Sequence, residues 1–393
     1  MPDQFLFISA YALSPPLLRV AELIIQKHRL EGHVIAPEEM AVSRIYHPAG
    51  KLSAWDVDLT SSPLQFHFVP AIRGNALDHG FNKAFLKNTL RRLSPDYIWV
   101  HDEFTHSITL QILQYYRFNR RPRIIAYVAQ NHTPGPHPLF YPNWPFISRT
   151  RLKHLILWPR LNGVAACATK SLECARRLGL PRKVPILVNY HPVFGPEEAA
   201  PAGASLPWSR DDGAFIVGFA GEITEQKGWK VLLQALARLP ENFKVVLVGD
   251  GDQRGELQEW LKQPHLSGQA HFTGPLPHQK LLATYPQFDV VVLPSITTPH
   301  AVEQFGRVLA EAMAWEVPVI GSRSGAIPET IGKAGLVVPE GDSVALAAAI
   351  GRLASEKSLQ RSLGNEGFKQ YLGHYRCEVY CRSLGNLLGL SPS

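Results

Sequence analysis

The chain has 393 residues, of which 45% are hydrophobic and 19% are charged. This balance is typical of folded globular proteins and excludes a largely disordered chain, and the length suits two domains better than one. No apolar run is long enough to cross a bilayer, and no basic segment precedes the first apolar run at Phe5. We therefore expect neither a membrane span nor a signal peptide.

The formal net charge of +7 is divided unevenly along the chain. Residues 1–195 contain 23 Lys+Arg and 12 Asp+Glu, a net +11, and the totals of 40 and 33 leave 17 and 21, a net −4, for residues 196–393. A basic half predicts an anionic partner, such as a membrane surface, a lipid-linked phosphate or an acidic glycan. We find no nucleic-acid-binding motif and predict no nucleic acid partner.

The four cysteines belong to no zinc-binding pattern, although Cys377 and Cys381 share a helix face. We therefore expect reduced thiols, no metal ion and no cofactor. The corresponding localisation is cytoplasmic, with the inner face of the membrane as an alternative place for the basic half.

Apolar patterns predict alternating strands and helices in the first half of the chain. Strands are expected at residues 5–9, 33–37, 64–69, 95–102, 123–129, 163–168 and 184–188, and helices at 16–28, 81–93, 108–116 and 170–178. The helix at 81–93 carries Lys83, Lys87 and Arg91 at four-residue spacing. Such a stripe is usually a solvated face, and contact with an anionic membrane is the alternative.

Polar side chains follow two of these strands. His101 and Asp102 end one strand, and Asn131 and His132 follow another. Because the carboxyl ends of parallel strands share one sheet edge, we expect both pairs at that edge, although a His-Asp pair also caps helices. Residues 133–160 then mix aromatic and basic side chains, which predicts either an acceptor-side lid or an ordinary packed loop.

A proline- and glycine-rich segment at 191–212 is the predicted linker. After it, strands are expected at residues 215–221, 245–248, 270–276, 288–293, 317–321 and 336–338, and helices at 229–239, 307–315, 343–354, 357–363 and 367–388. The prediction is an α/β chain of two doubly wound parallel-sheet domains, at 1–190 and 213–370, with a C-terminal helix in 371–393 that crosses back to the first domain.

The stretch from Glu303 to Met313 lies between a buried strand and a helix. Gly306 is placed near the helix N-terminus, where backbone N–H groups and the helix dipole favour an anion such as phosphate. Glu303 precedes the helix and Glu311 lies about a turn and a half inside it. Taken singly, each glutamate is better explained as a solvated acid.

The order of residues in this region resembles the donor site of glycosyltransferase family 4. The matching features are Glu303-x7-Glu311 with Phe305-Gly306, then Pro318-Val319-Ile320-Gly321, then Gly325-x-x-Pro328-Glu329. The form Glu-Gln-Phe-Gly-Arg-Val is similar to one bacterial branch. The resemblance implies a GT-B fold and retaining, metal-independent transfer from a nucleoside diphosphate sugar to a glycan or lipid-linked acceptor, in cell-surface polysaccharide synthesis.

The resemblance also implies residue roles. Glu303, Lys227 and His132 would be catalytic, with Lys227 on the departing diphosphate, His132 near the donor sugar and Glu311 on the ribose. The donor-binding set would be Gly221, Lys227, Asp250, Gly251, Leu276, Glu303, Phe305, Gly306, Arg307, Val308 and Glu311. The acceptor-side set would be Tyr11, His101, Asn131 and Arg149.

One residue departs from the family pattern. Glu222 occupies the position at which the family usually carries a phosphate-binding arginine, and a carboxylate repels phosphate. Arg307 then becomes the leading candidate for the second phosphate cation, with Arg323 as the other. Two alternatives stay open: a non-catalytic GT-B partner or regulatory protein, and a nucleotide-sugar epimerase.

Overall fold

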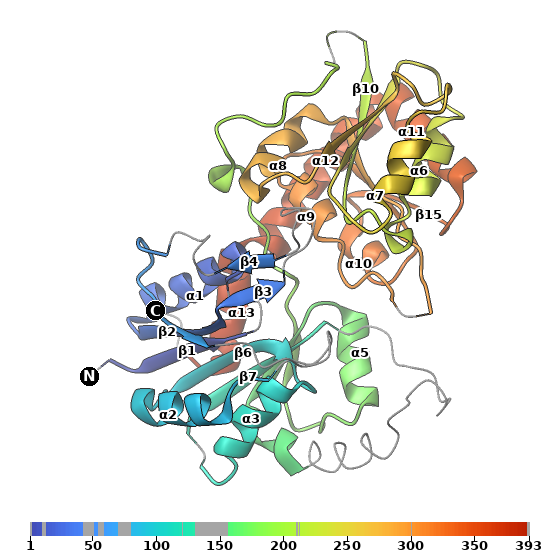
Figure 1. The fold of residues 1–393 in the computed structure, drawn as a ribbon. Helices are drawn as coiled ribbons and strands as arrows, with labels where there is room; N and C mark the ends of the chain where they lie inside the picture. Colours follow the sequence, from blue (N-terminus) through green and yellow to red (C-terminus); the bar gives the residue numbers. More distant parts are fainter. Residues whose placement is uncertain are drawn as a thin grey trace. The chain divides into compact units, whose positions relative to one another are not determined.

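The computed structural model describes residues 2–9, 13–41, 51–53, 59–69, 80–119, 121–129, 156–209, 211, 213–299 and 301–390. The chain divides into two units, each an α/β body built on one main sheet (Figure 1). The first unit comprises Met1–Ala41, Leu52–Pro192 and Cys377–Ser393, and the second comprises Val42–Lys51 and Val193–Arg376.

The first unit contains a seven-stranded parallel sheet. Its strand order is β5 (Gln65–Val69), β2 (Glu31–Pro37), β1 (Gln4–Ile8), β6 (Tyr97–Glu103), β7 (Arg123–Val128), β8 (Gly163–Ala166) and β9 (Ile186–Val188). The order reverses direction between β1 and β6, and such a switch point opens a crevice at the carboxyl ends of the strands. A separate two-stranded sheet pairs β3 (Glu39–Ala41) with β4 (Lys51–Ser53).

Helices cover both faces of this sheet because alternate strand residues point to opposite sides. The helices of this unit are α1 (Pro15–His28), α2 (Lys83–Leu93), α3 (Ser107–Tyr115), α5 (Thr169–Arg177), α13 (Cys377–Leu388) and the short 3-10 turn η3 (Trp158–Arg160). On one face Trp99 stacks on Phe7, with ring centroids 4.3 Å apart, and approaches Tyr380 of α13. Cys377 donates to the carbonyl of Pro16 in α1, so the last helix packs on the first.

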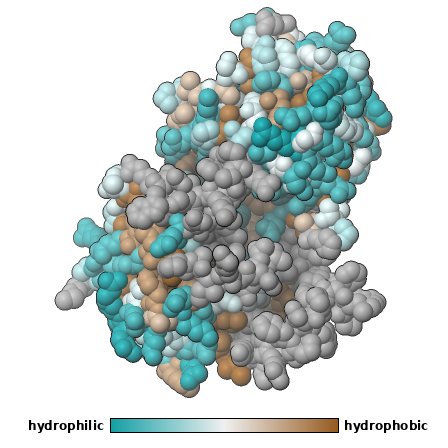
Figure 2. Space-filling model, viewed as in Figure 1, coloured by the Kyte–Doolittle hydropathy of each residue, from teal (hydrophilic) through white to brown (hydrophobic). Residues whose placement is uncertain are grey.

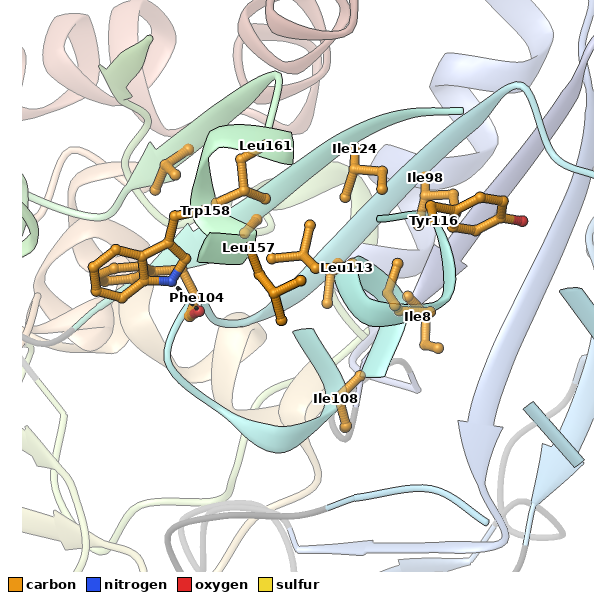
Figure 3. Close-up of a cluster of buried hydrophobic side chains, with 14 of the residues drawn as sticks. Ile8, Ile98, Phe104, Ile108, Leu113, Tyr116, Ile124, Leu157, Trp158 and Leu161 are labelled. Carbon is orange, nitrogen blue, oxygen red and sulfur yellow. Dashed lines mark hydrogen bonds between the residues drawn. The ribbon is translucent and has the colours of Figure 1, made fainter. Parts of the chain in front are cut away.

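The opposite face of the sheet carries the main core of the first unit (Figure 3). Ile8 and Ile98 from neighbouring strands meet Ile108 and Leu113 of α3 there. Trp158 is 1% exposed and donates its indole N–H to the carbonyl of Phe104 at 3.3 Å. Burial of this apolar surface stabilises the unit by about 25 cal/mol per Å².

The second unit contains a six-stranded parallel sheet. Its strand order is β12 (Ala270–Gly274), β11 (Phe243–Val248), β10 (Phe215–Ala220), β13 (Val290–Leu293), β14 (Val319–Ser322) and β15 (Gly335–Val338). The order reverses between β10 and β13. The fully buried runs of β10 and β13 explain why both were readable as parallel strands in the sequence.

The helices of the second unit alternate with these strands. They are α6 (Trp229–Leu236), α7 (Arg254–Trp260), α8 (His278–Thr284), α9 (Arg307–Met313), α10 (Ile327–Ile331), α11 (Ser343–Ser355) and α12 (Lys357–Gln370), with 3-10 turns η4 (Pro196–Glu198), η6 (Glu225–Lys227) and η7 (Tyr285–Gln287). Helices α6, α7 and α11 contribute apolar residues to one core with β10 and β11. Helix α9 packs on β13, and α10 packs on β14.

The predicted break between helices 357–363 and 367–388 is wrong. Helix α12 continues to Gln370, a π-helical turn η8 (Tyr371–Tyr375) follows, and α13 begins only after Arg376. Gly364 and Gly367, which lie at the predicted break, serve close packing inside α12. A Cβ on Gly364 would lie 2.2 Å from the carbonyl oxygen of Glu316, so the two segments approach closely only because the side chain is absent.

On the face shown in Figure 2, the second unit presents mostly hydrophilic residues with hydrophobic ones scattered among them. Scattered apolar residues are normal on protein surfaces. Across the described ranges, no helix is long and apolar enough to span a membrane.

Candidate functional site

The switch point of the second sheet collects the residues that the sequence singled out. Gly221 directly follows β10, and η6 then ends at Lys227, just before α6 begins. Ser295 and Glu303 follow the neighbouring strand β13, before α9 begins at Arg307. Both loops leave the carboxyl ends of adjacent parallel strands, which is where open α/β sheets bind ligands.

Glu303 is a buried carboxylate with defined partners. It is 7% exposed and accepts hydrogen bonds from Lys227 Nζ at 2.7 Å and Ser295 Oγ at 2.9 Å. Burial alone would raise the pKa of Glu303, but the Lys227 charge and the hydrogen bonds from Lys227, Ser295 and the Gly306 amide lower it below the usual value. The interpretation of Glu303 as a solvated loop acid is therefore wrong.

Two glycines let the backbone close around this pair. A Cβ on Gly325, where φ is +52°, would lie 1.9 Å from the carbonyl oxygen of Glu303, and that oxygen accepts from the Ala326 amide at 3.0 Å. A Cβ on Gly228, where φ is +71°, would lie 1.9 Å from the carbonyl oxygen of Pro294. Both positions combine a left-handed backbone with a close contact, so only glycine fits.

Packing and a side-chain hydrogen bond hold the loop between Glu303 and α9 in place. Gly306, at φ +81°, is the N-cap of α9. Phe305 is 3% exposed, lies edge-on to Tyr375, and its carbonyl accepts from Thr330 Oγ1 at 2.5 Å. Val308 is buried in the core, so any contact that it makes with a ligand runs through its backbone.

Glu311 is more deeply buried than Glu303. Its side chain has no exposed surface, His278 Nε2 lies 2.9 Å from Oε1, and the Tyr285 hydroxyl donates to Oε2 at 2.8 Å. Burial would raise the pKa of Glu311, but His278, then Arg307 and the Tyr285 hydrogen bond lower it. The interpretation of Glu311 as a surface helix acid is therefore also wrong.

Arg307 points along its own helix. Its Nε lies 3.7 Å from Glu311 Oε1, at i,i+4 spacing, and its side chain is 32% exposed. The structure thus pairs Arg307 with Glu311 and Lys227 with Glu303. The role of Arg307 as second phosphate cation stays a prediction.

The remaining predicted donor residues lie at the ends of β10, β11 and β12. Asp250 Oδ1 accepts from the Gly251 amide at 2.9 Å, and its Oδ2 pairs with Arg254 at 3.2 Å. A Cβ on Gly251 would lie 2.4 Å from the Ile223 carbonyl oxygen, which ties this turn to the loop after Gly221. Leu276 is 8% exposed and directly precedes the Pro277-His278 start of α8.

Glu222 lies in the loop after Gly221 and is half-buried. Within the part of the chain that the structure describes, its carboxylate makes no hydrogen bond or ion pair. In the same described ranges, no group of three or more His, Cys, Asp or Glu side chains is placed to hold a metal ion.

In the first unit, His101 is a buried aromatic-cluster residue. It is 4% exposed, its ring centroid lies 4.0 Å from that of Tyr127, and burial followed by the neighbouring His191 lowers its pKa. Asp102, the adjacent candidate, accepts from His106 Nδ1 at 2.7 Å. The other acceptor-side residues, Tyr11, Asn131 and Arg149, and the predicted catalytic His132 lie outside the described residues.

The last residues of the predicted acceptor-side lid pack against the rest of the first unit. Trp158 is packed in the core, and Arg160 donates to the carbonyls of Asn119 at 2.6 Å and Pro122 at 2.7 Å. For these two residues the packed-loop interpretation is the correct one. Residues 133–155 of that segment lie outside the described ranges.

Comparison with known proteins adds an independent observation. Residues 207–370 match the model of a family described as Glycosyl transferases group 1. Those residues form a glycosyl transferases group 1 domain. The Lys227–Glu303 pair and the buried Glu311 all lie inside it, as do the other predicted donor-binding residues. The narrower assignment to family 4 and its bacterial branch stays a prediction.

Two curated proteins that are similar to this domain are described as glycosyltransferases. A 2-deoxystreptamine glucosyltransferase of Streptomyces kanamyceticus is 34% identical over 143 residues, which cover 35% of this chain and 36% of that protein. A lipopolysaccharide core biosynthesis glycosyltransferase of Rhizobium meliloti is 31% identical over 183 residues, 46% of this chain and 51% of that protein. The chain thus matches about half or less of the length of these curated relatives.

A solved structure shares the fold over nearly the whole chain. The structure of Anabaena HepE in complex with UDP has a TM-score of 0.71 at 17% identity, and the match covers 99% of this chain and 100% of that chain. At this identity the similarity shows the fold alone. The prediction of a GT-B architecture with two parallel-sheet α/β units is therefore confirmed.

Sequence reasoning missed three residues that surround the two glutamates. Ser295 directly follows Pro294 at the end of β13, and this position at a strand end was the available signal. His278 and Tyr285 are seven residues apart at the two ends of the α8 segment, and such spacing places side chains on one helical face.

Proposed function

We propose that this chain is a retaining, metal-independent glycosyltransferase. It moves a sugar from a nucleoside diphosphate sugar to a glycan or lipid-linked acceptor in cell-surface polysaccharide synthesis. The observation that carries the proposal is the pair of half-buried Lys227 and buried Glu303 at the switch point of a glycosyl transferases group 1 domain. UDP in the similarly folded Anabaena protein and glycosyl transfer by the relatives support the same class of donor.

The residues at this switch point have complementary tasks in the proposed reaction. The diphosphate gains negative charge as the bond to the sugar breaks, and an ammonium held in a poorly solvated place stabilises that charge. Lys227 supplies the ammonium, and the N-terminus of α9 at Gly306 supplies backbone N–H groups. Glu303, held ionised, accepts hydrogen bonds from sugar hydroxyls and fixes the position of the sugar.

The basic first half is assigned to the acceptor and, for a lipid-linked acceptor, to the inner face of the membrane. Lys83, Lys87 and Arg91 are exposed along α2, and no acidic residue lies in that helix. Their charges favour an anionic lipid surface or an anionic acceptor, and that attraction weakens as salt screens it.

A thermal-unfolding panel of nucleoside diphosphate sugars tests donor binding. A donor present at 100 times its Kd stabilises the protein by about 2.7 kcal/mol and raises the unfolding midpoint by roughly 5 °C. The donor that gives the largest shift is then incubated with lipid-linked acceptors, and the product is analysed. Absence of a shift with every nucleotide sugar would refute the proposal.

Glu222 favours one competing function, a non-catalytic GT-B partner, because its charge opposes a diphosphate in the usual arginine position. A transfer assay on the natural protein, with Glu222→Arg beside it, separates the two. If the natural protein is catalytic, the variant changes an existing transfer rate; if it is not, transfer is absent before the substitution. An epimerase, the weaker alternative, would convert the nucleotide sugar with no acceptor present.

A further inference from the structure

We infer that the turn after α3, residues 116–119, attaches the first unit to an anionic membrane by inserting Phe118 among the lipid headgroups. The inference rests on the proposed function for its choice of the inner face of the membrane. It places the contact at a turn to which the proposed function gives no role. Vesicle binding tests it with neither donor nor acceptor present, so its failure leaves the proposed transfer standing.

The first observation is the charge of the chain around this turn. Residues 104–172 contain nine Lys+Arg and no Asp or Glu, a net +9 that makes up most of the +11 of residues 1–195. Arg117 and Arg121 are exposed, and across the described ranges neither of them forms an ion pair with a carboxylate. Exposed cations of this kind are attracted to the phosphates of anionic lipids.

The second observation is an exposed aromatic ring beside these arginines. Phe118 is 89% exposed, and the Arg117 guanidinium lies over its ring, 4.6 Å from the centroid. Tyr115, the last residue of α3, is 37% exposed. One exposed apolar residue is normal on a protein surface, but an apolar ring next to cations matches a bilayer interface, where anionic headgroups lie beside acyl chains.

The third observation is that the turn is held in place from the protein side. Tyr116 is buried in the core shown in Figure 3. Arg160 donates to three carbonyls of this segment, those of Tyr116 at 3.2 Å, Asn119 at 2.6 Å and Pro122 at 2.7 Å. The Asn119 side chain also accepts from the Arg121 amide at 3.1 Å. A ring presented by a turn that is already ordered loses little conformational freedom when it binds.

The exposure of Phe118 favours a fluid partner over a rigid one. Its ring projects from the surface of the unit. A rigid glycan or protein would cover only part of a projecting ring, whereas lipid molecules close around it and remove its whole apolar surface from water. An anionic membrane therefore takes up both the ring and the arginine charges beside it.

The position of the turn in the fold agrees with this role. The turn precedes β7, so it lies at the amino edge of the first sheet. The crevice at the switch point of that sheet opens at the opposite edge, where the parallel strands end. Insertion of Phe118 into a membrane would therefore leave the crevice of the first unit accessible to an acceptor.

Sedimentation of the full chain with lipid vesicles tests the inference. The natural protein should bind vesicles that contain phosphatidylcholine and phosphatidylglycerol, and it should stay in solution with vesicles of phosphatidylcholine alone. Phe118→Ser should weaken binding to the anionic vesicles by about 10–100-fold. Arg117→Gln should weaken it by about fivefold at low salt, and by less at high salt, because salt screens the charge that the variant removes.

The matched control is Val344→Ser. Val344 is 60% exposed on α11 of the second unit, so this variant also replaces an exposed apolar side chain with serine. It should bind the anionic vesicles as tightly as the natural protein does. Because both residues are exposed, the thermal midpoints should stay unchanged and show that the variants are folded.

A fluorescent label measures insertion at the residue itself. The four cysteines of the chain are buried, so a thiol-reactive dye labels Phe118→Cys or Val344→Cys selectively. With a polarity-sensitive dye at position 118, the emission should shift to shorter wavelength when anionic vesicles are added. The same dye at position 344 should show no shift.

Three outcomes would overturn the inference. They are no binding of the natural protein to anionic vesicles, equal binding by Phe118→Ser and the natural protein, and no emission shift at position 118. Binding of a soluble acidic polysaccharide that depends on Phe118, without binding of vesicles, would assign the turn to a glycan instead. All of these leave the proposed transfer standing, which the thermal panel of nucleotide sugars tests separately.

Discussion

Glu303 is ionised inside the protein because a lysine lies against it. An unpaired buried carboxylate would take up a proton, and Lys227 at 2.7 Å prevents this. The contact also holds Lys227 in place, since its Nζ donates to the Glu303 carboxylate. Each member of the pair therefore prepares the other for a diphosphate sugar, which carries both negative phosphate and neutral hydroxyl groups.

The position of Glu303 depends on Gly325. Gly325→Ala would place a methyl group 1.9 Å from the Glu303 carbonyl oxygen, so the Glu303 backbone must shift. We expect a loss of roughly 1–3 kcal/mol in unfolding free energy, together with a large fall in transfer rate. Denaturant unfolding and a transfer assay measure the two effects.

The matched control for this prediction is Gly341→Ala. Gly341 has a similarly positive φ, +72°, with nothing within 4 Å of the added Cβ, so the substitution costs only about 1 kcal/mol of backbone strain and should leave transfer unchanged. Equal loss of transfer in both variants would show that Gly325 does not act through Glu303.

The sequence identified the two glutamates and the lysine, but not their burial. Taken singly, each glutamate was better explained as solvated, because acids seldom lie in cores. Partners that lie far away in the sequence reverse that expectation. Lys227, for example, is 76 residues away from Glu303. Their ligand contacts remain predictions, because the resemblance to a family supplied those roles.

Among the elements, apolar runs rich in β-branched residues gave the strands of both sheets correctly. The short helices α7, α8 and α10 were missed, because each offers only a few buried positions and little periodicity. The reverse error occurred in α12, where a break was predicted at 364–366 and the helix runs on to Gln370. Glycine has two uses, as a helix terminator and as a close-packing residue, and local sequence does not separate them.

Two helix glycines should respond in opposite directions to alanine. Gly364→Ala gains helix propensity but forces Cβ to within 2.2 Å of the Glu316 carbonyl oxygen, so we expect destabilisation by roughly 1–3 kcal/mol. Gly351 of α11 has its nearest neighbour, Leu239 Cδ2, 3.9 Å away. Gly351→Ala should therefore stabilise the protein by up to about 1 kcal/mol. Unfolding free energies with the same sign would contradict this explanation of α12.

For the molecule as a whole, we expect a relay of hydrogen bonds at one edge of the first sheet to contribute to acid stability. Arg92 donates to His67 Nδ1 at 3.2 Å, His67 Nε2 lies 3.3 Å from His33 Nδ1, and His33 Nε2 lies 2.7 Å from Gln4 Oε1. Gln4 in turn donates to Glu31 at 2.7 Å. This direction of donation requires both imidazoles to be neutral.

Burial, then His33 and Arg92, lower the pKa of His67 to about 4, and burial also lowers that of His33 despite the opposing charge of Glu31. Because these folded-state values lie below the ordinary 6.5, the unfolded chain binds more protons between pH 6.5 and about 4. Their contribution to stability is thus complete above pH 6.5 and declines as the pH falls toward 4.

The thermal midpoint should accordingly fall over this pH interval. In His67→Gln the decline should be shallower, because this variant lacks one of the two histidines that are neutral in the folded protein. His265→Gln, an exposed control, should follow the natural protein. Parallel curves for His67→Gln and the natural protein would show that the relay does not set acid stability.

The central claim is that Lys227 stabilises the diphosphate of a sugar donor, and the transfer rate of Lys227→Met tests it most directly. The control is Lys230→Met, at the second residue of α6. This substitution removes an ion pair with Glu256 at the surface, and such pairs contribute little to stability. With the donor found in the thermal panel, kcat should fall by about 10²–10³-fold in Lys227→Met and stay unchanged in Lys230→Met. Transfer by Lys227→Met at the natural rate would contradict the account.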